Sequence, residues 1–152
     1  MNELKVEGDT IQFIVVKIGK EQFGIDIKFI DNIVRMQHIT RVPKVADYLC
    51  GVINLRGEVI PVMSLRVKMN LSADTISKDT RIIILKFEQQ GAIGIIVDEV
   101  KEVITIDASQ VDKVTYDTKD ERINFLSGVG KTDNGLISIL DLNVVVAEKE
   151  NA

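Results

Sequence analysis

Residues suited to nucleophilic or metal chemistry are scarce in this chain. His38 is the only histidine and Cys50 the only cysteine among 152 residues, so a Ser-His-Asp triad or a Cys–His dyad would have to use them. His38 stands in the polar stretch RMQHITR without a nucleophile beside it, and we expect it to be solvated. Cys50 closes the apolar stretch VADYLC, as a packed core thiol would. Because one His and one Cys cannot form a structural zinc site, we predict no catalytic, cofactor or metal site.

GVGKT, at residues 128–132, resembles a phosphate-binding loop. A P-loop needs a glycine five residues before its second glycine, and counting back from Gly130 gives Phe125 instead. The loop must also open a helix, whereas a hairpin turn and the strand-like LISIL follow here. We therefore predict no nucleotide site at this position.

Three acidic residues, Asp98, Glu99 and Glu102, follow an apolar segment. Neighbouring residues of a strand point to opposite faces, so Asp98 and Glu99 should not converge as an acid–base pair. We expect solvated surface carboxylates. A chain rich in structure but without a catalytic constellation is typical of a binding module.

The composition is that of a globular protein, with 45% hydrophobic and 28% charged residues. The net charge is −4 and no basic cluster is visible, which argues against a nucleic-acid partner. No apolar run approaches the roughly 18 to 20 residues of a membrane helix, and the acidic start is unlike a signal peptide. We expect a cytoplasmic protein without direct membrane insertion and, with one cysteine, without an internal disulfide.

Short β-strands dominate the predicted secondary structure, because Ile and Val are frequent and Gly, Asn and Asp separate the apolar segments. The predicted strands are 10–18, 23–27, 51–55, 59–65, 81–87, 92–100, 103–106, 123–131 and 136–140. Short helices are expected at 27–34, 45–50, 64–71 and 141–150, the last with Asp141 as its N-cap.

The polar stretch 72–80 divides these strands into two groups. Neither group is large enough to bury a stable hydrophobic core alone. The unbroken apolar runs at 82–85 and 94–97 indicate strands buried on both faces. We predict a mainly β fold of two small barrels packed around a shared hydrophobic interface. They would form one domain over 1–152, divided near 72–80, with exchange of strands between the two halves allowed.

The segment GVINLRGEVIPVMSL, at 51–65, closely resembles the signature of the CheW-like family, the coupling proteins of bacterial chemotaxis. Three further segments support the resemblance over about residues 10–146: FGIDIKFIDNIVR followed by ITRVP, AIGIIVDEVKEVITI, and FLSGVGKTDNGLISILDL. The resemblance implies two SH3-like five-stranded β-barrels packed against each other.

The resemblance also implies a non-catalytic adaptor. Family members bridge the cytoplasmic tip of methyl-accepting chemotaxis receptors to the histidine kinase CheA, so that receptors control kinase activity. The receptor tip packs into the groove between the barrels, and the kinase's regulatory domain, which has the same fold, meets the coupling protein barrel to barrel. The same surfaces build rings in receptor arrays. The implied location is the cytoplasm, with recruitment to membrane receptor arrays.

By this resemblance, the tip of segment 51–65 binds a partner through Asn54, Arg56, Gly57 and Glu58. Strand periodicity turns Ile53 and Leu55 toward the core and Asn54 and Arg56 toward a partner. Gly57 permits a tight reversal, and the planar guanidinium of Arg56 suits an interface. The alternative for Arg56 is a solvated hairpin arginine.

A second predicted contact is Ile30-Asp31-Asn32-Ile33. Relatives often carry an acidic residue where this chain has Asn32, and Asp31 beside it is a candidate to supply that charge. The alternative for Ile30 and Ile33 is simple packing at helical spacing. Three glycines match the family pattern and are expected to serve backbone bends or close approaches: Gly51, Gly94 and Gly128.

Other functions stay open on the sequence alone. One is a coupling protein of a non-chemotaxis receptor–kinase pathway, and another is a small uncharacterised enzyme, which would need a polar pocket with a perturbed residue. A third is an SH3-like module for proline-rich peptides or single-stranded nucleic acid, which would need exposed aromatic residues. The aromatic residues stand mostly within apolar runs and are expected in the core: Phe13, Phe23, Phe29, Phe87, Phe125, Tyr48 and Tyr116.

Overall fold

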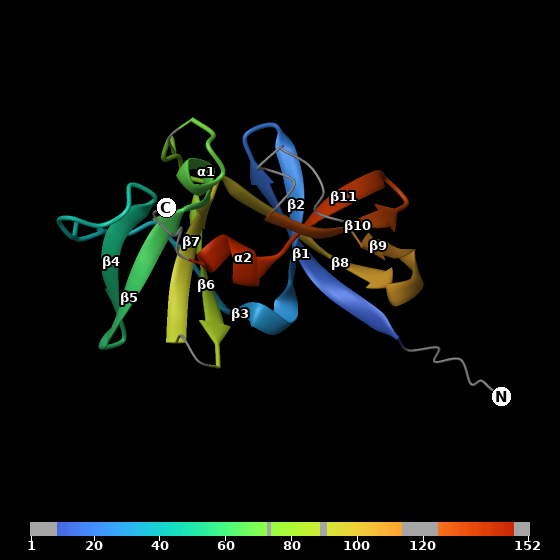
Figure 1. Ribbon diagram of the computed structural model, residues 1–152, viewed down its shortest axis with the longest axis horizontal. Helices are drawn as coiled ribbons and strands as arrows, with labels where there is room; N and C mark the ends of the chain where they lie inside the picture. The colour runs from blue at the N-terminus through green and yellow to red at the C-terminus, as the bar shows by residue number, and fades with distance from the viewer. Residues whose placement is uncertain (1–8, 73, 89–90, 114–124, 148–152) are drawn as a thin grey trace.

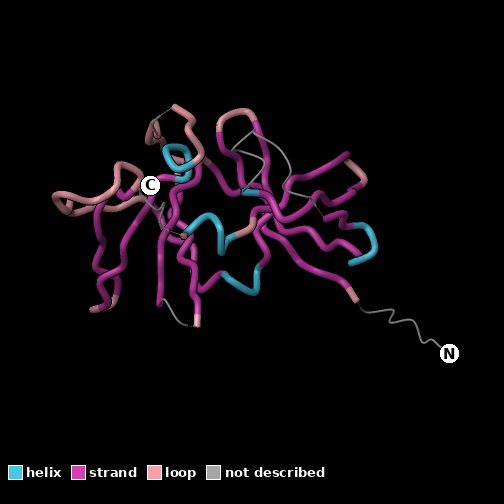
Figure 2. Tube along the Cα trace, in the orientation of Figure 1, coloured by secondary structure: helices cyan, strands magenta, loops and turns pink. Residues whose placement is uncertain are grey.

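The computed structural model describes residues 9–72, 74–88, 91–113 and 125–147. These residues contain eleven strands in two sheets and four short helical segments (Figures 1 and 2). The predicted mainly β fold class is therefore confirmed. Tyr116, the start of the predicted strand 123–131 and the end of the predicted helix 141–150 lie outside the described residues.

One sheet has six strands in the order β8-β1-β2-β11-β10-β9 and forms the right-hand part of Figure 1. Its neighbours pair antiparallel, except that β11 pairs parallel with β2. The strands are β1 (Thr10–Ile18), β2 (Glu21–Asp26), β8 (Glu99–Asp107), β9 (Val111–Lys113), β10 (Leu126–Thr132) and β11 (Gly135–Leu140).

The other sheet has five strands in the order β3-β6-β7-β5-β4 and lies on the left in Figure 1. Its neighbours pair antiparallel, except that β5 pairs parallel with β7. The strands are β3 (Ile30–Arg35), β4 (Leu49–Leu55), β5 (Glu58–Ser64), β6 (Arg81–Phe87) and β7 (Gly91–Val97).

The chain does not fill the two sheets in sequence order. It begins with β1 and β2 of the six-stranded sheet, completes the five-stranded sheet with β3 to β7, and returns to the six-stranded sheet with β8 to β11. The polar stretch 72–80 joins α1 (Leu65–Lys68) to β6, and the strands on either side of it, β5 and β6, belong to the same sheet.

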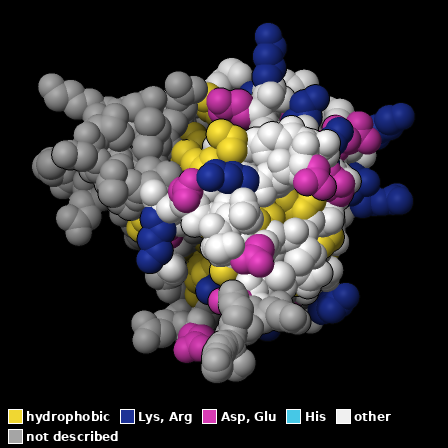
Figure 3. Space-filling view, turned by 90° about the vertical axis from the view of Figure 1, so that its right-hand side faces the viewer, with side chains coloured by type: hydrophobic (Ala, Val, Ile, Leu, Met, Phe, Trp, Pro, Cys, Tyr) yellow, Lys and Arg dark blue, Asp and Glu magenta, His cyan; other side chains and the backbone are white. Residues whose placement is uncertain are grey.

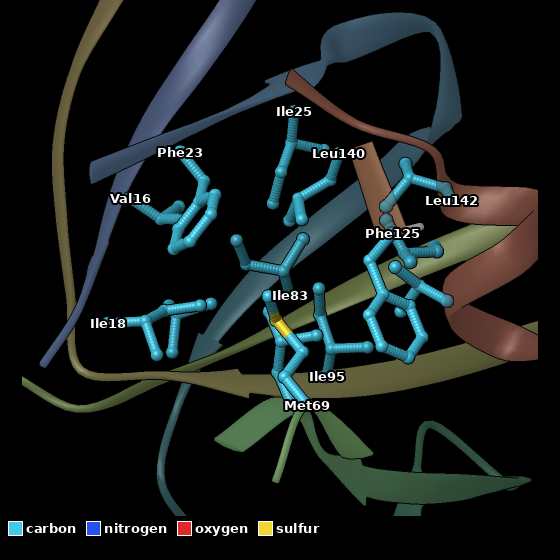
Figure 4. Packing of buried hydrophobic residues seen from close by; sticks show 14 of the residues in the cluster. Val16, Ile18, Phe23, Ile25, Met69, Ile83, Ile95, Phe125, Leu140 and Leu142 are labelled. Atoms are coloured by element: carbon cyan, nitrogen blue, oxygen red, sulfur yellow. The ribbon is translucent and has the colours of Figure 1, made fainter. Parts of the chain in front are cut away.

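The largest hydrophobic cluster lies between the two sheets (Figure 4). Val16, Ile18, Phe23 and Ile25 enter it from the six-stranded sheet, and Ile83 and Ile95 enter it from the five-stranded sheet. Ile82, Ile84 and Ile96 point the other way, into a second cluster inside the five-stranded sheet. The unbroken apolar runs of β6 and β7 are therefore explained by burial on both faces.

The predicted helices are partly wrong. The segment 27–34 forms only the 3-10 turn η1 (Ile27–Phe29) before β3 begins, because its β-branched residues pair with β6. The segment 45–50 is not a helix, since its last residues, Leu49 and Cys50, already belong to β4.

The other two predicted helices are present but short. α1 is capped by the Ser64 side chain, which accepts from the Val67 N–H at 3.1 Å. α2 (Leu142–Val146) is capped by Asp141, which accepts from the Val144 N–H at 3.4 Å, and it packs between the sheets (Figure 1).

Several strand boundaries differ from the prediction by one or two residues, and the largest difference lies between residues 92 and 107. The predicted strand 92–100 ends at Val97, and β8 then runs without interruption through the predicted strand 103–106. The short strand β9, preceded by the 3-10 turn η2 (Ala108–Gln110), was not predicted, because three residues carry too little pattern.

Candidate protein-binding surface

The β4–β5 hairpin ends in a two-residue turn made by Arg56 and Gly57. Leu55 pairs with Glu58, and the turn residues have φ angles of 55° and 84°. Two positive φ angles in succession are the pattern of a type I′ turn, which matches the twist of the flanking strands. Arg56 is therefore a turn residue and not part of the strand face on which it was predicted to lie. Gly57 adopts the positive φ that the prediction required of it.

The hairpin tip is polar, exposed and held in shape. The side-chain oxygen of Asn54 accepts a hydrogen bond from the Gly57 N–H at 3.1 Å, which ties the strand end to the turn. Asn54, Arg56, Gly57 and Glu58 are all exposed, while Ile53 behind them is only 2% exposed. Arg56 forms no ion pair with a described carboxylate. Its guanidinium is thus free to donate several directed hydrogen bonds to a partner.

The second predicted cluster, Ile30 to Ile33, lies on the edge strand β3 with an irregular register between Ile30 and Asn32. Helical spacing is therefore the wrong description, although Ile30 and Ile33 do pack partly buried against the core between the sheets. Asp31 is exposed and lies 3.8 Å from the Lys86 ammonium. The Asn32 side chain accepts from the Ile33 N–H at 2.8 Å, so it is occupied locally.

Both clusters lie at the same end of the five-stranded sheet. Ile30 pairs with Leu85 near the end of β6, which in turn pairs with the start of β7 at Gly91. β5 runs parallel to β7 and starts at Glu58, beside the hairpin tip. The sheet order nevertheless places β3 and β4 on opposite edges, so the two clusters flank this end of the sheet.

The three glycines predicted to serve close approaches, Gly51, Gly94 and Gly128, each lie against backbone or side-chain atoms of another segment. A Cβ added to Gly51 would lie 2.1 Å from the Thr40 carbonyl oxygen, and its φ of +145° already disfavours a side chain. At Gly94 an added Cβ would lie 2.8 Å from the Ile82 side chain, and at Gly128 it would lie 2.7 Å from the carbonyl oxygen of Asp112.

An ion pair between Arg66 and Asp98 was missed by the sequence analysis. The Arg66 Nη2 atom lies 2.6 Å from Asp98 Oδ2, and Nε lies 3.1 Å from Oδ1. Asp98 also accepts from the Gly19 N–H at 2.7 Å, so its expected role as a solvated carboxylate is wrong. The hydrogen bond from Arg66 lowers the pKa of Asp98 below its usual value. Arg66 and Asp98 lie 32 positions apart in the sequence, and no local sequence pattern indicates that they pair.

Asp74 is the carboxylate whose environment opposes ionisation. Burial raises its pKa, although the Ser64 hydroxyl donates to it at 2.5 Å and Arg66 lies nearby. Burial also raises the pKa of Cys50, which keeps this thiol protonated. His38 is exposed, as expected of a solvated histidine, and Cys50 is partly buried against the hydrophobic cluster inside the five-stranded sheet, so a Cys50–His38 dyad gains no support from these positions.

Other chemical sites are likewise missing from the described residues. They hold no group of three or more His, Cys, Asp or Glu residues able to bind a metal ion. GVGKT lies within β10 and is not a loop that opens a helix. A hollow of about 810 Å³ lies beside residues 44–49 and α2, but neither Asp74 nor Cys50 lines it. None of the six aromatic residues that the structure describes is exposed, which disfavours a proline-peptide or single-strand binding groove.

The helices that the structure describes are all too short to cross a lipid bilayer.

The far end of the six-stranded sheet carries charges of both signs, with small hydrophobic areas between them (Figure 3). Val103 of β8 and Leu136 of β11 are the large apolar residues of this sheet that are most exposed, at 56% and 72%.

Comparisons with known proteins agree with one another. A family model described as CheW-like domain matches residues 12–150. The chemotaxis protein CheW of Bacillus subtilis is 36% identical over 141 residues, which cover 93% of this chain and 89% of that protein. The chemotaxis protein CheW of Helicobacter pylori is 37% identical over 138 residues, covering 91% and 82%.

A solved structure shows the same fold. The crystal structure of the scaffolding protein TtCheW from Thermoanaerobacter tengcongensis superposes with a TM-score of 0.82 at 34% sequence identity. The match covers 91% of this chain and 94% of that one.

Proposed function

The chain belongs to the CheW-like domain family and is a coupling adaptor of bacterial chemotaxis; we propose that it works without catalysis, by bridging two proteins. The partners are the cytoplasmic tip of methyl-accepting chemotaxis receptors and the regulatory domain of the histidine kinase CheA. By holding both, the adaptor places kinase activity under receptor control. It acts in the cytoplasm and is recruited to receptor arrays at the membrane.

The observation that carries this proposal is the hairpin tip at Asn54, Arg56, Gly57 and Glu58. The Asn54–Gly57 hydrogen bond and the tight turn fix the backbone from which the exposed Arg56 side chain projects. A backbone that is already ordered loses little entropy when the tip meets a partner, and arginine is frequent among the residues that dominate interfaces. We assign these four residues to partner binding.

The β3 segment from Ile30 to Ile33 is the second proposed contact, because it flanks the same end of the sheet. Here Asp31 supplies the negative charge, since Asn32 has none and its side chain is already bonded to the Ile33 N–H. Gly51, Gly94 and Gly128 support binding only indirectly, by allowing the close backbone contacts that shape the sheets.

We further propose that residues 1–152 act as one domain of two subdomains with exchanged strands, and that its surfaces take part in rings with CheA and other CheW-like domains. The shared core between the sheets supports the first point, because neither sheet buries its apolar face alone.

Calorimetric titration tests the proposal. The wild-type chain is titrated with the regulatory domain of the same organism's CheA and, separately, with a receptor-tip fragment. We expect wild type to bind both, Arg56→Glu to lose one of them while staying folded, and the matched surface change Arg41→Glu to bind like wild type. If wild type binds neither partner, the bridging role is wrong. If Arg56→Glu binds both as tightly as wild type, the tip is not the docking surface.

A further inference from the structure

Two arginines lie directly opposite each other on neighbouring strands of the five-stranded sheet. Arg35 ends β3, Arg81 begins β6, and the antiparallel register pairs them. Side chains of directly opposed residues share one face of a sheet, with Cβ atoms about 4.5–5.5 Å apart. Like charges in this arrangement repel and lower stability. The fold therefore keeps a juxtaposition that its own stability does not favour.

No described carboxylate forms an ion pair with either arginine, although the chain has 23 acidic residues against 19 Lys and Arg. Arg81 is half-buried and anchored, because its Nη1 donates to the carbonyl oxygens of Lys78 at 2.8 Å and Thr80 at 3.0 Å. Its Nε and Nη2 have no partner among the described residues. Arg35 is exposed, and its backbone carbonyl accepts from the Gln37 side chain at 3.4 Å.

We propose that Arg35 and Arg81 together bind an acidic segment of a partner protein. The planar fork of a guanidinium fits a carboxylate with two parallel hydrogen bonds, and two adjacent forks fit two neighbouring carboxylates. Arg81 supplies the fixed donor, while the exposed Arg35 adapts to the ligand. Binding also removes the repulsion between the two arginines, so the cost built into the free protein is recovered in the complex.

This surface is separate from the hairpin tip. β5 begins beside the tip and runs parallel to β7, whose last residue, Val97, pairs with Arg81. The Arg35–Arg81 pair therefore lies at the opposite end of the five-stranded sheet from Arg56. The inference rests on the proposed function only in taking the acidic ligand to be a protein, as the partners of an adaptor are.

The test uses the full chain and a synthetic octaglutamate peptide as the probe. We expect peptide binding that weakens as NaCl is raised, with the largest amide NMR changes at Arg35 and Arg81. Arg35→Gln should weaken the peptide affinity about tenfold, and the matched control Arg41→Gln should change it less than about twofold. Arg35→Gln should melt at the same temperature as wild type or higher, because it relieves repulsion. Arg81→Gln also loses two backbone hydrogen bonds, so Arg35→Gln carries the test.

Three results would overturn the proposal: equal peptide affinity for Arg35→Gln and wild type, a lower melting temperature for Arg35→Gln, or complete displacement of the peptide by equimolar inorganic phosphate. The last result would assign the pair to small anions instead of protein carboxylates. Titrating the CheA regulatory domain and the receptor-tip fragment into the same variants then identifies the protein partner. If neither binds wild type, the bridging role fails while the peptide result still decides this proposal.

Discussion

Arg66 and Asp98 join the two sheets at the point where the chain crosses between them. Arg66 lies in α1, just after β5 of the five-stranded sheet, and its Nη2 is 2.6 Å from Asp98 Oδ2. Asp98 lies between β7 and β8 and also accepts from Gly19, in the turn that links β1 to β2. One carboxylate thus connects α1, the crossover and a turn of the other sheet. The pair is a structural link, whereas Arg56 and Arg35 face outward.

The Arg66–Asp98 pair predicts a specific pH dependence of stability. The folded pKa of Asp98 is lowered, so its contribution is present above the unfolded value of about 3.9 and is lost as pH falls through the lowered folded value. The side chains are only 16% and 25% exposed, and Asp98→Asn should cost about 2 kcal/mol of unfolding free energy at pH 7.

Urea unfolding of wild type and Asp98→Asn at pH 7 and at about pH 2 checks this prediction. The difference between the two proteins should shrink at the acidic pH. The raised pKa of Asp74 acts in the opposite direction, but it is present in both proteins and largely cancels. An equal difference at both pH values would contradict the assigned role of the charge.

Arg56 holds a backbone conformation that suits asparagine better. Its φ is 55°, and Asn-Gly is the preferred pair for a type I′ turn. Arg56→Asn should therefore raise the unfolding free energy by about 0.5 kcal/mol while weakening the binding of the partner that contacts the tip. Chemical denaturation and calorimetry on the same sample measure both quantities. Unchanged affinity for both partners would count against a binding role for this arginine, and a loss of stability would contradict the explanation from the turn conformation.

Gly51 should tolerate no side chain. An added Cβ would lie 2.1 Å from the Thr40 carbonyl oxygen, so Gly51→Ala must open the contact between Thr40 and Val52. We expect a loss of about 3 kcal/mol or more in unfolding free energy. Gly57→Ala is the matched control, because an added Cβ there meets nothing within 4 Å and only the positive φ costs about 1 kcal/mol. Similar losses in the two variants would contradict the steric explanation.

The shared core predicts that both sheets unfold together. Ile83 is fully buried between them, and Ile83→Ala should cost about 3 kcal/mol, against about 1 kcal/mol for Ile83→Val. Scanning calorimetry of wild type and both variants should show one transition that moves as a unit. Two transitions, of which Ile83→Ala moves only one, would mean that the sheets are independent.

Sequence patterns predicted the strands and the hairpin tip well. β6 has the predicted bounds 81–87, and β1 the bounds 10–18, because long apolar or alternating segments flanked by turn residues leave little freedom. The sequence patterns gave a wrong prediction at β3, where Ile30 and Ile33 have helical spacing. This segment is a strand because it pairs with β6, which lies about 50 residues later in the sequence.

Relationships between distant residues could not be predicted from the sequence. The return of β8 to the sheet of β1 and β2 depends on packing of the whole chain. The Arg66–Asp98 link and the opposition of Arg35 and Arg81 follow from that topology, and each joins residues that carry no shared local pattern. The family resemblance identified the function because it spans most of the chain, not because any single residue discloses it.

The most direct test of the central claim is receptor control of the kinase in a reconstituted system. Autophosphorylation of the same organism's CheA is measured on receptor-containing membranes without this chain, with wild type, with Arg56→Glu and with Arg41→Glu. We predict that kinase activity responds to receptor ligand only when a coupling-competent chain is present, so wild type and Arg41→Glu restore the response and Arg56→Glu does not. Kinase activity that responds to the receptor ligand equally well without the chain would contradict the adaptor role.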